Sequence, residues 1–175
     1  MQRSRNNGED SYRRDVEVLA TLLVAYPEVS RATFDPEQKA LGMVFLCRGP
    51  MSAAARTKLT DIYKDSVEVY GLLNGRTANL VTTRWERMDR FYSFQIERDV
   101  ATLSPGELNL TVDLVRQNAK IVPACEGLED FDDGEEYTVP ARLFLQEMLE
   151  QVRVMESPRK LVALREGERV LVFDK

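Results

Sequence analysis

The sequence predicts an α+β fold, in which an antiparallel sheet has its helices packed mainly on one face. One pattern recurs three times along the chain: a helical stretch followed by two short strands joined by a tight turn, an αββ unit. Apolar and polar residues alternate in most of these strands, which is typical of antiparallel sheets with one solvated face. The three units share this pattern but not their residues, so the sequence contains no repeat by identity.

The first unit consists of a helix over residues 16–26 and strands over 29–34 and 40–47. Apolar side chains recur along the helix at spacings of three and four residues, so they share one face. They are Val16, Leu19, Leu22, Leu23 and Tyr26. Pro36 lies in the turn between the strands, where its ring presets φ for a type I turn. The second strand is almost entirely apolar, which predicts a central place in the sheet.

The second unit consists of a helix over residues 52–73 and strands over 78–85 and 91–98. Ser52 is a suitable N-cap, and the Asn-Gly pair after the helix ends it because both residues tolerate the left-handed conformation. The predicted inward face of this helix comprises Ala55, Leu59, Ile62, Ser66, Val69 and Leu73. Both strands alternate, which indicates half-buried antiparallel strands with one wet face.

The segment that follows carries two competing patterns. Ser104, Pro105 and Glu107 form a capping-box signature with proline at the first helical position, which predicts a helix through about residue 120. The apolar residues at 108, 110, 112 and 114 also alternate, as in a strand. We favour the helix because the cap and the length agree; a strand here would imply two sheets instead of one.

The third unit consists of a helix over residues 139–155 and strands over 161–164 and 170–173. The two strands surround a Glu-Gly turn, and we expect this last hairpin to pair onto an existing sheet. For the whole chain we expect a disordered tail at 1–11, an αββαββ domain over 12–103, and a C-terminal unit of two helices and a hairpin over 104–175, packed beside that domain or on the same core.

The composition is that of an ordinary globular protein, with 43% hydrophobic and 30% charged residues among 175. The first ten residues lack the apolar run of a signal peptide, and no stretch approaches the ~20 apolar residues of a membrane span. We therefore expect a cytoplasmic protein. The net charge of −5 lies mostly in the C-terminal part, which disfavours a dedicated nucleic-acid binder.

Several kinds of catalytic and cofactor site are absent from the sequence. The chain contains no histidine and two cysteines, which removes Ser-His-Asp and Cys-His machinery and most zinc, iron–sulfur and haem sites. No glycine-rich phosphate-binding loop occurs. The sequence therefore predicts no catalytic residue, no metal ligand set and no cofactor, and both cysteines are expected to be reduced and structural.

An acidic segment at 126–136 is the first candidate binding site. Its central carboxylates are Asp130, Asp132, Asp133 and Glu135. Such a cluster supplies the oxygen ligands that a hard cation needs, but the glycine falls too early for a calcium-binding loop. We interpret the segment as a solvated loop, or as a docking site for a basic partner.

The hairpin around residues 84–92 is the second candidate binding site. Three arginines and three aromatic residues, one of them Phe91, gather near its turn. The candidate binding residues among them are Arg84, Trp85, Arg87, Arg90 and Tyr92. Arginine and exposed rings neutralise phosphates and stack bases, and both are enriched in protein interfaces. Strand alternation offers a structural alternative, a core tryptophan beside a charged hairpin tip.

These observations favour a non-enzymatic cytosolic interaction protein, a regulator, adaptor or assembly factor that acts through protein–protein contacts, with an unknown protein partner and a homodimeric state. The first alternative is an RNA- or single-strand-binding module that uses the 84–92 hairpin. The second is a metal-dependent enzyme that uses the acidic segment. No motif in this sequence points to a particular protein family.

Overall fold

The structure, a computed structural model, describes residues 3–123, 143–150, 153, 159–167 and 169–174, with side chains from residue 12 onward. The elements are α1 (Arg3–Ala25), β1 (Val29–Asp35), β2 (Ala40–Arg48), α2 (Ala53–Leu73), β3 (Val81–Met88), β4 (Phe91–Asp99), α3 (Pro105–Asn118), β5 (Leu161–Glu166) and β6 (Arg169–Asp174). Residues 143–150 form a further helix.

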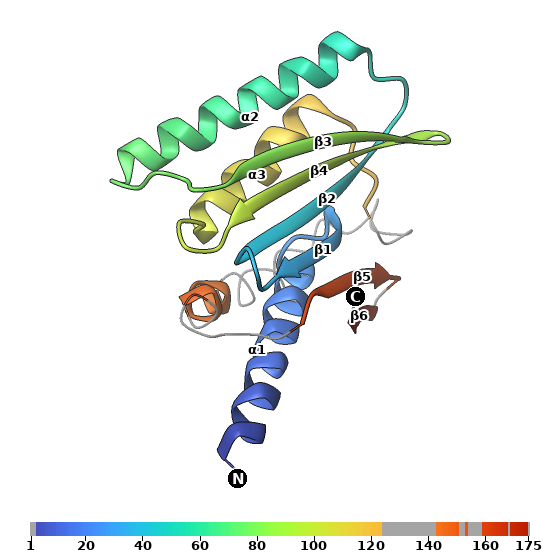
Figure 1. Cartoon of the computed structure of the whole chain (residues 1–175). Coiled ribbons are helices and arrows are strands. Elements are labelled where there is room, and N and C mark those ends of the chain that lie inside the picture. The colour runs from blue at the N-terminus through green and yellow to red at the C-terminus, as the bar shows by residue number, and fades with distance from the viewer. Residues whose placement is uncertain (1–2, 124–142, 151–152, 154–158, 168, 175) are drawn as a thin grey trace.

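The strands form one antiparallel sheet of six, in the order β3-β4-β2-β1-β5-β6 (Figure 1). β2 and β1 are the two central strands, and β2 pairs with β4 over the whole length of both, with Ala40 opposite Asp99 and Arg48 opposite Phe91. The C-terminal hairpin joins this same sheet, because β5 pairs with β1. The predicted α+β class with an antiparallel sheet is therefore confirmed.

The helices that contact the sheet lie on one of its faces, where they bury the core. α1 packs against β1, β5 and β6, while α2 packs against α3 and β3. The buried strand residues on this face include Ala32, Met43, Phe45, Phe94, Ile96 and Ala163. Strand alternation directs the remaining side chains to the opposite face, on which no described helix packs. We call this second face the open face.

α1 and α2 differ from the helices that the apolar pattern predicted. α1 begins at Arg3, so it includes most of the segment that the sequence analysis assigned to a disordered tail. In α2 the buried residues are Leu59, Tyr63 and Val67. The predicted inward face was wrong at both ends of α2, where Ala55 is exposed and Leu73 is 82% exposed. Tyr63 fixes the rotation of α2, because its ring packs edge-on against Phe94 in the sheet.

α3 is a helix, so the alternation across residues 108–114 does not produce a second sheet. Ser104 caps it by accepting a hydrogen bond from the Glu107 backbone nitrogen at 3.3 Å, and Pro105 occupies the first turn. Its buried residues are Glu107, Leu108, Thr111, Val112 and Val115. The cap signal therefore outweighs the period-two pattern, as predicted.

Candidate binding surface

The candidate residues of the β3–β4 hairpin lie on both faces of the sheet. Arg84 lies on the open face, opposite Gln95. Trp85 pairs with Phe94 and Tyr92 pairs with Cys47, which places both aromatic residues on the helix face. The two rings and Arg84 therefore do not form one surface.

Trp85 and Tyr92 hold α2 against the sheet. The Trp85 ring stacks on Phe94 with 4.4 Å between centroids, and its Nε1 donates a hydrogen bond to Thr60 Oγ1 of α2 at 3.0 Å. The Arg56 guanidinium of α2 lies over the Tyr92 ring at 4.6 Å. These contacts agree with the structural alternative considered for this hairpin, a packed tryptophan.

The other candidate residues lie at the hairpin tip or outside the described residues. Arg87 and Arg90 are exposed, and Arg90 forms a solvent-exposed ion pair with Asp89 at 3.7 Å. The four acids of the 126–136 segment, Asp130, Asp132, Asp133 and Glu135, lie outside the described residues. Within the described residues no group of three or more Cys, Asp or Glu side chains could hold a metal ion.

A groove of about 460 Å³ crosses the open face. Gly42 forms part of its floor, with Thr33 of β1 beside it. A Cβ atom at position 42 would lie 2.2 Å from Thr33 Oγ1, so any other residue would displace that side chain and fill the floor. The groove therefore depends on glycine at this position.

Cations border this groove on both sides: Arg31, Arg84 and Lys160. Lys160 Nζ pairs with Asp35 at 2.7 Å, and its hydrogen bond is the main reason that the pKa of the Asp35 carboxyl is lowered. Arg31 is half-buried, and its Nε atom is buried without a hydrogen-bond partner among the described residues. Glu97 also lines the groove, where it accepts a hydrogen bond from Thr82 at 3.2 Å.

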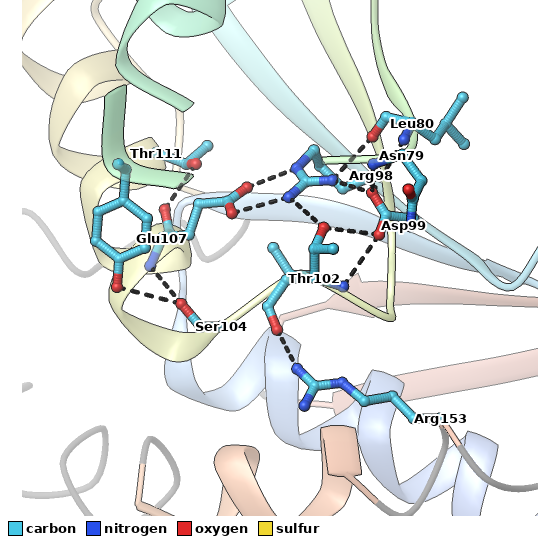
Figure 2. Close-up of polar contacts among 11 residues, drawn as sticks. Asn79, Leu80, Arg98, Asp99, Thr102, Ser104, Glu107, Thr111 and Arg153 are labelled. Atoms are coloured by element: carbon cyan, nitrogen blue, oxygen red, sulfur yellow. Dashed lines mark hydrogen bonds and ion pairs between the residues drawn. The ribbon is translucent and has the colours of Figure 1, made fainter. Parts of the chain in front are cut away.

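Arg98 is the centre of a buried polar network that the sequence analysis did not identify. It is 1% exposed and lies on the helix face of β4. Figure 2 shows its guanidinium between Glu107 on one side and Asp99 with the Leu80 carbonyl on the other. Nε and Nη2 donate to the two Glu107 oxygens at 2.6 and 2.9 Å, a bidentate pair. Nη1 donates to Leu80 O and Asp99, and Nη2 also donates to Thr102, so all five N–H groups have partners.

Asp99 joins three chain segments within this network (Figure 2). Its Oδ1 accepts hydrogen bonds from the Asn79 and Leu80 backbone nitrogens at 3.0 Å, and its Oδ2 accepts from Thr102. Burial alone would raise the pKa of Asp99, but the hydrogen bonds from Thr102 and Leu80 and the charge of Arg98 outweigh it and lower the pKa. A cavity of about 160 Å³ adjoins the network. Because all its N–H groups are engaged, Arg98 has no free hydrogen-bond donor for a ligand in this cavity.

Two local signals in the sequence pointed to this network. Arg98 follows Phe94 and Ile96 at the same alternation, which places it on the inward face. Glu107 was interpreted as the capping-box acid, whereas its carboxylate pairs with Arg98. A charged residue at an inward strand position, with an acid at the start of the following helix, is the pattern that identifies such a pair.

Cys47 is a buried, reduced thiol on the helix face of β2. Burial raises its pKa to about 11, so it is protonated at neutral pH. No helix in the described part of the chain is long and apolar enough to cross a membrane.

Comparison with protein-family models, with curated proteins and with solved structures gives no match for this chain.

Proposed function

We propose that this protein is a cytosolic, non-enzymatic interaction protein, a regulator, adaptor or assembly factor, that binds an acidic segment of a partner protein on its open face. The groove between Arg31, Arg84 and Lys160 is the observation that carries this proposal. A carboxylate of the partner would pair with the half-buried Arg31 guanidinium, which has no ion-pair partner among the described residues.

The open face favours a protein partner over a nucleic acid. Recognition of single strands relies on aromatic side chains that stack on bases. Trp85 and Tyr92 are engaged on the helix face, and Glu86 and Glu97 lie among the cations of the open face. These carboxylates repel a continuous phosphate backbone. A protein segment can instead carry separate acidic residues, each opposite one of the cations.

The chemistry of the described residues supports a role without catalysis. The chain has no histidine, and the one cysteine described is buried and protonated at neutral pH. Arg98 and Glu107 are a charged pair inside the core, and each satisfies the other. These groups stabilise the fold and supply neither a nucleophile nor a general base to the groove.

A charge reversal in the groove tests the proposal with a defined probe. Binding of a fluorescent hexaglutamate peptide is measured by anisotropy at low salt for the wild type, Arg84→Glu and Arg90→Glu. We expect Arg84→Glu to weaken binding by about tenfold or more, because a charge-assisted contact becomes a repulsion. Arg90→Glu is the matched control, since Arg90 lies at the hairpin turn with a side chain 88% exposed.

Equal binding by the wild type and Arg84→Glu would contradict the groove as the site. Binding of oligouridine but not of hexaglutamate, with a steep loss of affinity as salt rises, would replace the proposal with the nucleic-acid alternative. Both variants should keep the wild-type melting temperature, because Arg84 and Arg90 are exposed.

The same proposal includes self-association into a homodimer. Large apolar side chains remain exposed at the β5–β6 end of the open face: Leu164, Leu171 and Phe173, at 38%, 36% and 48%. Adjacent exposed apolar residues of this size are typical of interaction surfaces.

A further inference from the structure

The two end strands of the sheet differ in how they are protected. β3 carries charges along its length, at Arg84, Glu86 and Arg87. β6 carries charges only near its ends, at Arg169 and Asp174, and the residues between them are Val-Leu-Val-Phe. Natural proteins protect edge strands with charge, proline or a bulge, and β6 shows none of these along its centre.

The apolar side chains of the β5–β6 hairpin form a patch that reaches this edge. Leu171 lies opposite Leu164, and Phe173 lies opposite Val162, all on the open face. The outer strand of the pair contributes Phe173, the most exposed of these large side chains. Among the described strands β6 pairs with β5 alone, so the patch ends at a strand edge where a second strand would both extend the sheet and cover Leu171 and Phe173.

α1 is also only partly covered by the rest of the described chain. In Figure 1 its N-terminal turns extend past β5 and β6, away from the other elements. Tyr12 ties the helix to this end of the sheet, because the Arg159 guanidinium lies over its ring at 5.7 Å. Most helical stability in proteins comes from tertiary packing, so a second chain beside this end of the sheet would also stabilise α1.

We propose that β6 pairs with β6 of a second copy of this chain, in antiparallel orientation about a two-fold axis perpendicular to the sheet. The two six-stranded sheets then form one continuous sheet. This inference rests on the proposed self-association and locates its interface. An isologous interface needs a self-complementary surface, and an edge strand that pairs with itself is one.

The geometry of the hairpin restricts the register. A two-fold axis perpendicular to the sheet keeps each face on its own side, so residues that meet across it share a face. Glu166 lies opposite Arg169 across a two-residue turn, which makes that pair a hydrogen-bonded one. The alternation from there directs the backbone groups of Val170, Val172 and Asp174 outward.

One register uses all three of these outward-facing residues. It places Val172 opposite Val172 of the second copy, and Val170 opposite Asp174. Leu171 then lies opposite Phe173 twice on the open face, so the apolar patches of the two copies join. Aromatic–aliphatic pairs of this kind stabilise neighbouring strands.

Disulfide trapping tests this register. In a Cys125→Ser background, Val172→Cys should form a disulfide-linked dimer under mild oxidation, because residues opposite each other in a hydrogen-bonded pair lie about 5.5 Å apart. Thr83→Cys is the matched control, a half-buried position on the opposite edge strand. A dimer linked through Thr83→Cys, or a wild-type dimer in which Val172→Cys stays unlinked, would overturn the interface.

Charge insertion gives an independent measurement. We expect Leu171→Glu to be monomeric by light scattering at concentrations where the wild type is dimeric, because the change buries two carboxylates beside Phe173 in the dimer. Val69→Glu, the same kind of change at a position 54% exposed on α2, should remain dimeric. A dimeric Leu171→Glu would contradict the proposal.

Failure of the interface and failure of the partner site are separable. Arg84 lies on β3, at the opposite edge of the sheet from β6, so Arg84→Glu should lose hexaglutamate binding and remain dimeric. A wild type that is monomeric at micromolar concentration would refute self-association and this interface while leaving the groove untouched.

Discussion

Two buried tyrosines show how much depends on a single hydroxyl group. Tyr26 and Tyr63 are both 0% exposed. Tyr26 donates a hydrogen bond to Asn109 Oδ1 at 2.8 Å, so it links α1 to α3. The Tyr63 hydroxyl has no hydrogen-bond partner among the described residues, and burial raises its pKa. Burial of an unpaired hydroxyl costs roughly 1–3 kcal/mol.

We therefore expect opposite effects from the same substitution at these two positions. Tyr63→Phe should leave the free energy of unfolding unchanged or raise it by up to about 1 kcal/mol, since it removes an unpaired polar atom and keeps the ring. Tyr26→Phe should lower it by about 1 kcal/mol, since a hydrogen bond is lost. Urea denaturation of both variants measures the difference. Equal destabilisation would mean that the Tyr63 hydroxyl has a partner.

The sequence predicted some of the buried residues and missed others. The three- and four-residue spacing in α1 correctly predicted that Leu19, Leu22 and Tyr26 are inward. Tyr63 was missed because a helix with several apolar stripes does not reveal from its own sequence which stripe meets the sheet. The stripe that contains Tyr63 faces the sheet because Tyr63 packs against Phe94, which lies in β4.

The Arg98 network is the main polar link between β4 and α3. Arg98 lies on β4 and Glu107 in the first turn of α3, and both are almost fully buried. Removal of one partner leaves an uncompensated buried charge, which typically costs roughly 3–5 kcal/mol. Replacement of both partners by apolar residues is often close to neutral.

We expect Glu107→Leu to be more destabilised than the double variant Arg98→Met/Glu107→Leu. The single change leaves the Arg98 guanidinium without its bidentate acceptor, whereas the double change removes both buried charges. Free energies of unfolding from urea titrations give the comparison. A double variant at least as unstable as Glu107→Leu would show that Arg98 stabilises the fold mainly through Asp99, Thr102 and Leu80.

The positions of the strands and turns were predictable because their signals are local. Asp35 begins the turn between β1 and β2, where its Oδ1 accepts from the Glu37 and Gln38 backbone nitrogens at 3.1 and 3.2 Å. The pairing of strands that are distant in sequence was less predictable, since α2 and β3 lie between β2 and its neighbour β4. The groove depends on that choice, because Arg31 and Arg84 reach it from strands that do not pair with each other.

The whole molecule should become less stable in acid. The pKa values of Asp35 and Asp99 are both lowered in the folded state, by Lys160 in one case and by the Arg98 network in the other. A carboxyl with a lowered folded pKa contributes stability above its unfolded pKa, about 3.9, and loses it as the pH falls through the folded value. The melting temperature should therefore be flat above about pH 5 and fall below pH 4.

Asp99→Asn should reduce this acid dependence. The variant is expected to melt below the wild type at neutral pH, because it removes the charge that faces Arg98, and to lose less stability between pH 4 and pH 2. Thermal melts from pH 2 to pH 7 test this, with Asp113→Asn, an exposed position on α3, as the control for loss of one carboxylate. An acid slope identical to that of the wild type would exclude Asp99 as a source.

The sheet order also has a consequence for how the chain folds. β1–β2 and β3–β4 are hairpins of neighbouring strands, but β1 completes its pairing only with β5, from Arg31 to Leu164. Contacts between residues so distant in sequence are slow to form, because loop-closure entropy is lost before they contribute. On the ribosome the first four strands can therefore assemble while β1 is still an open edge, and synthesis of the C-terminal hairpin ends that exposure.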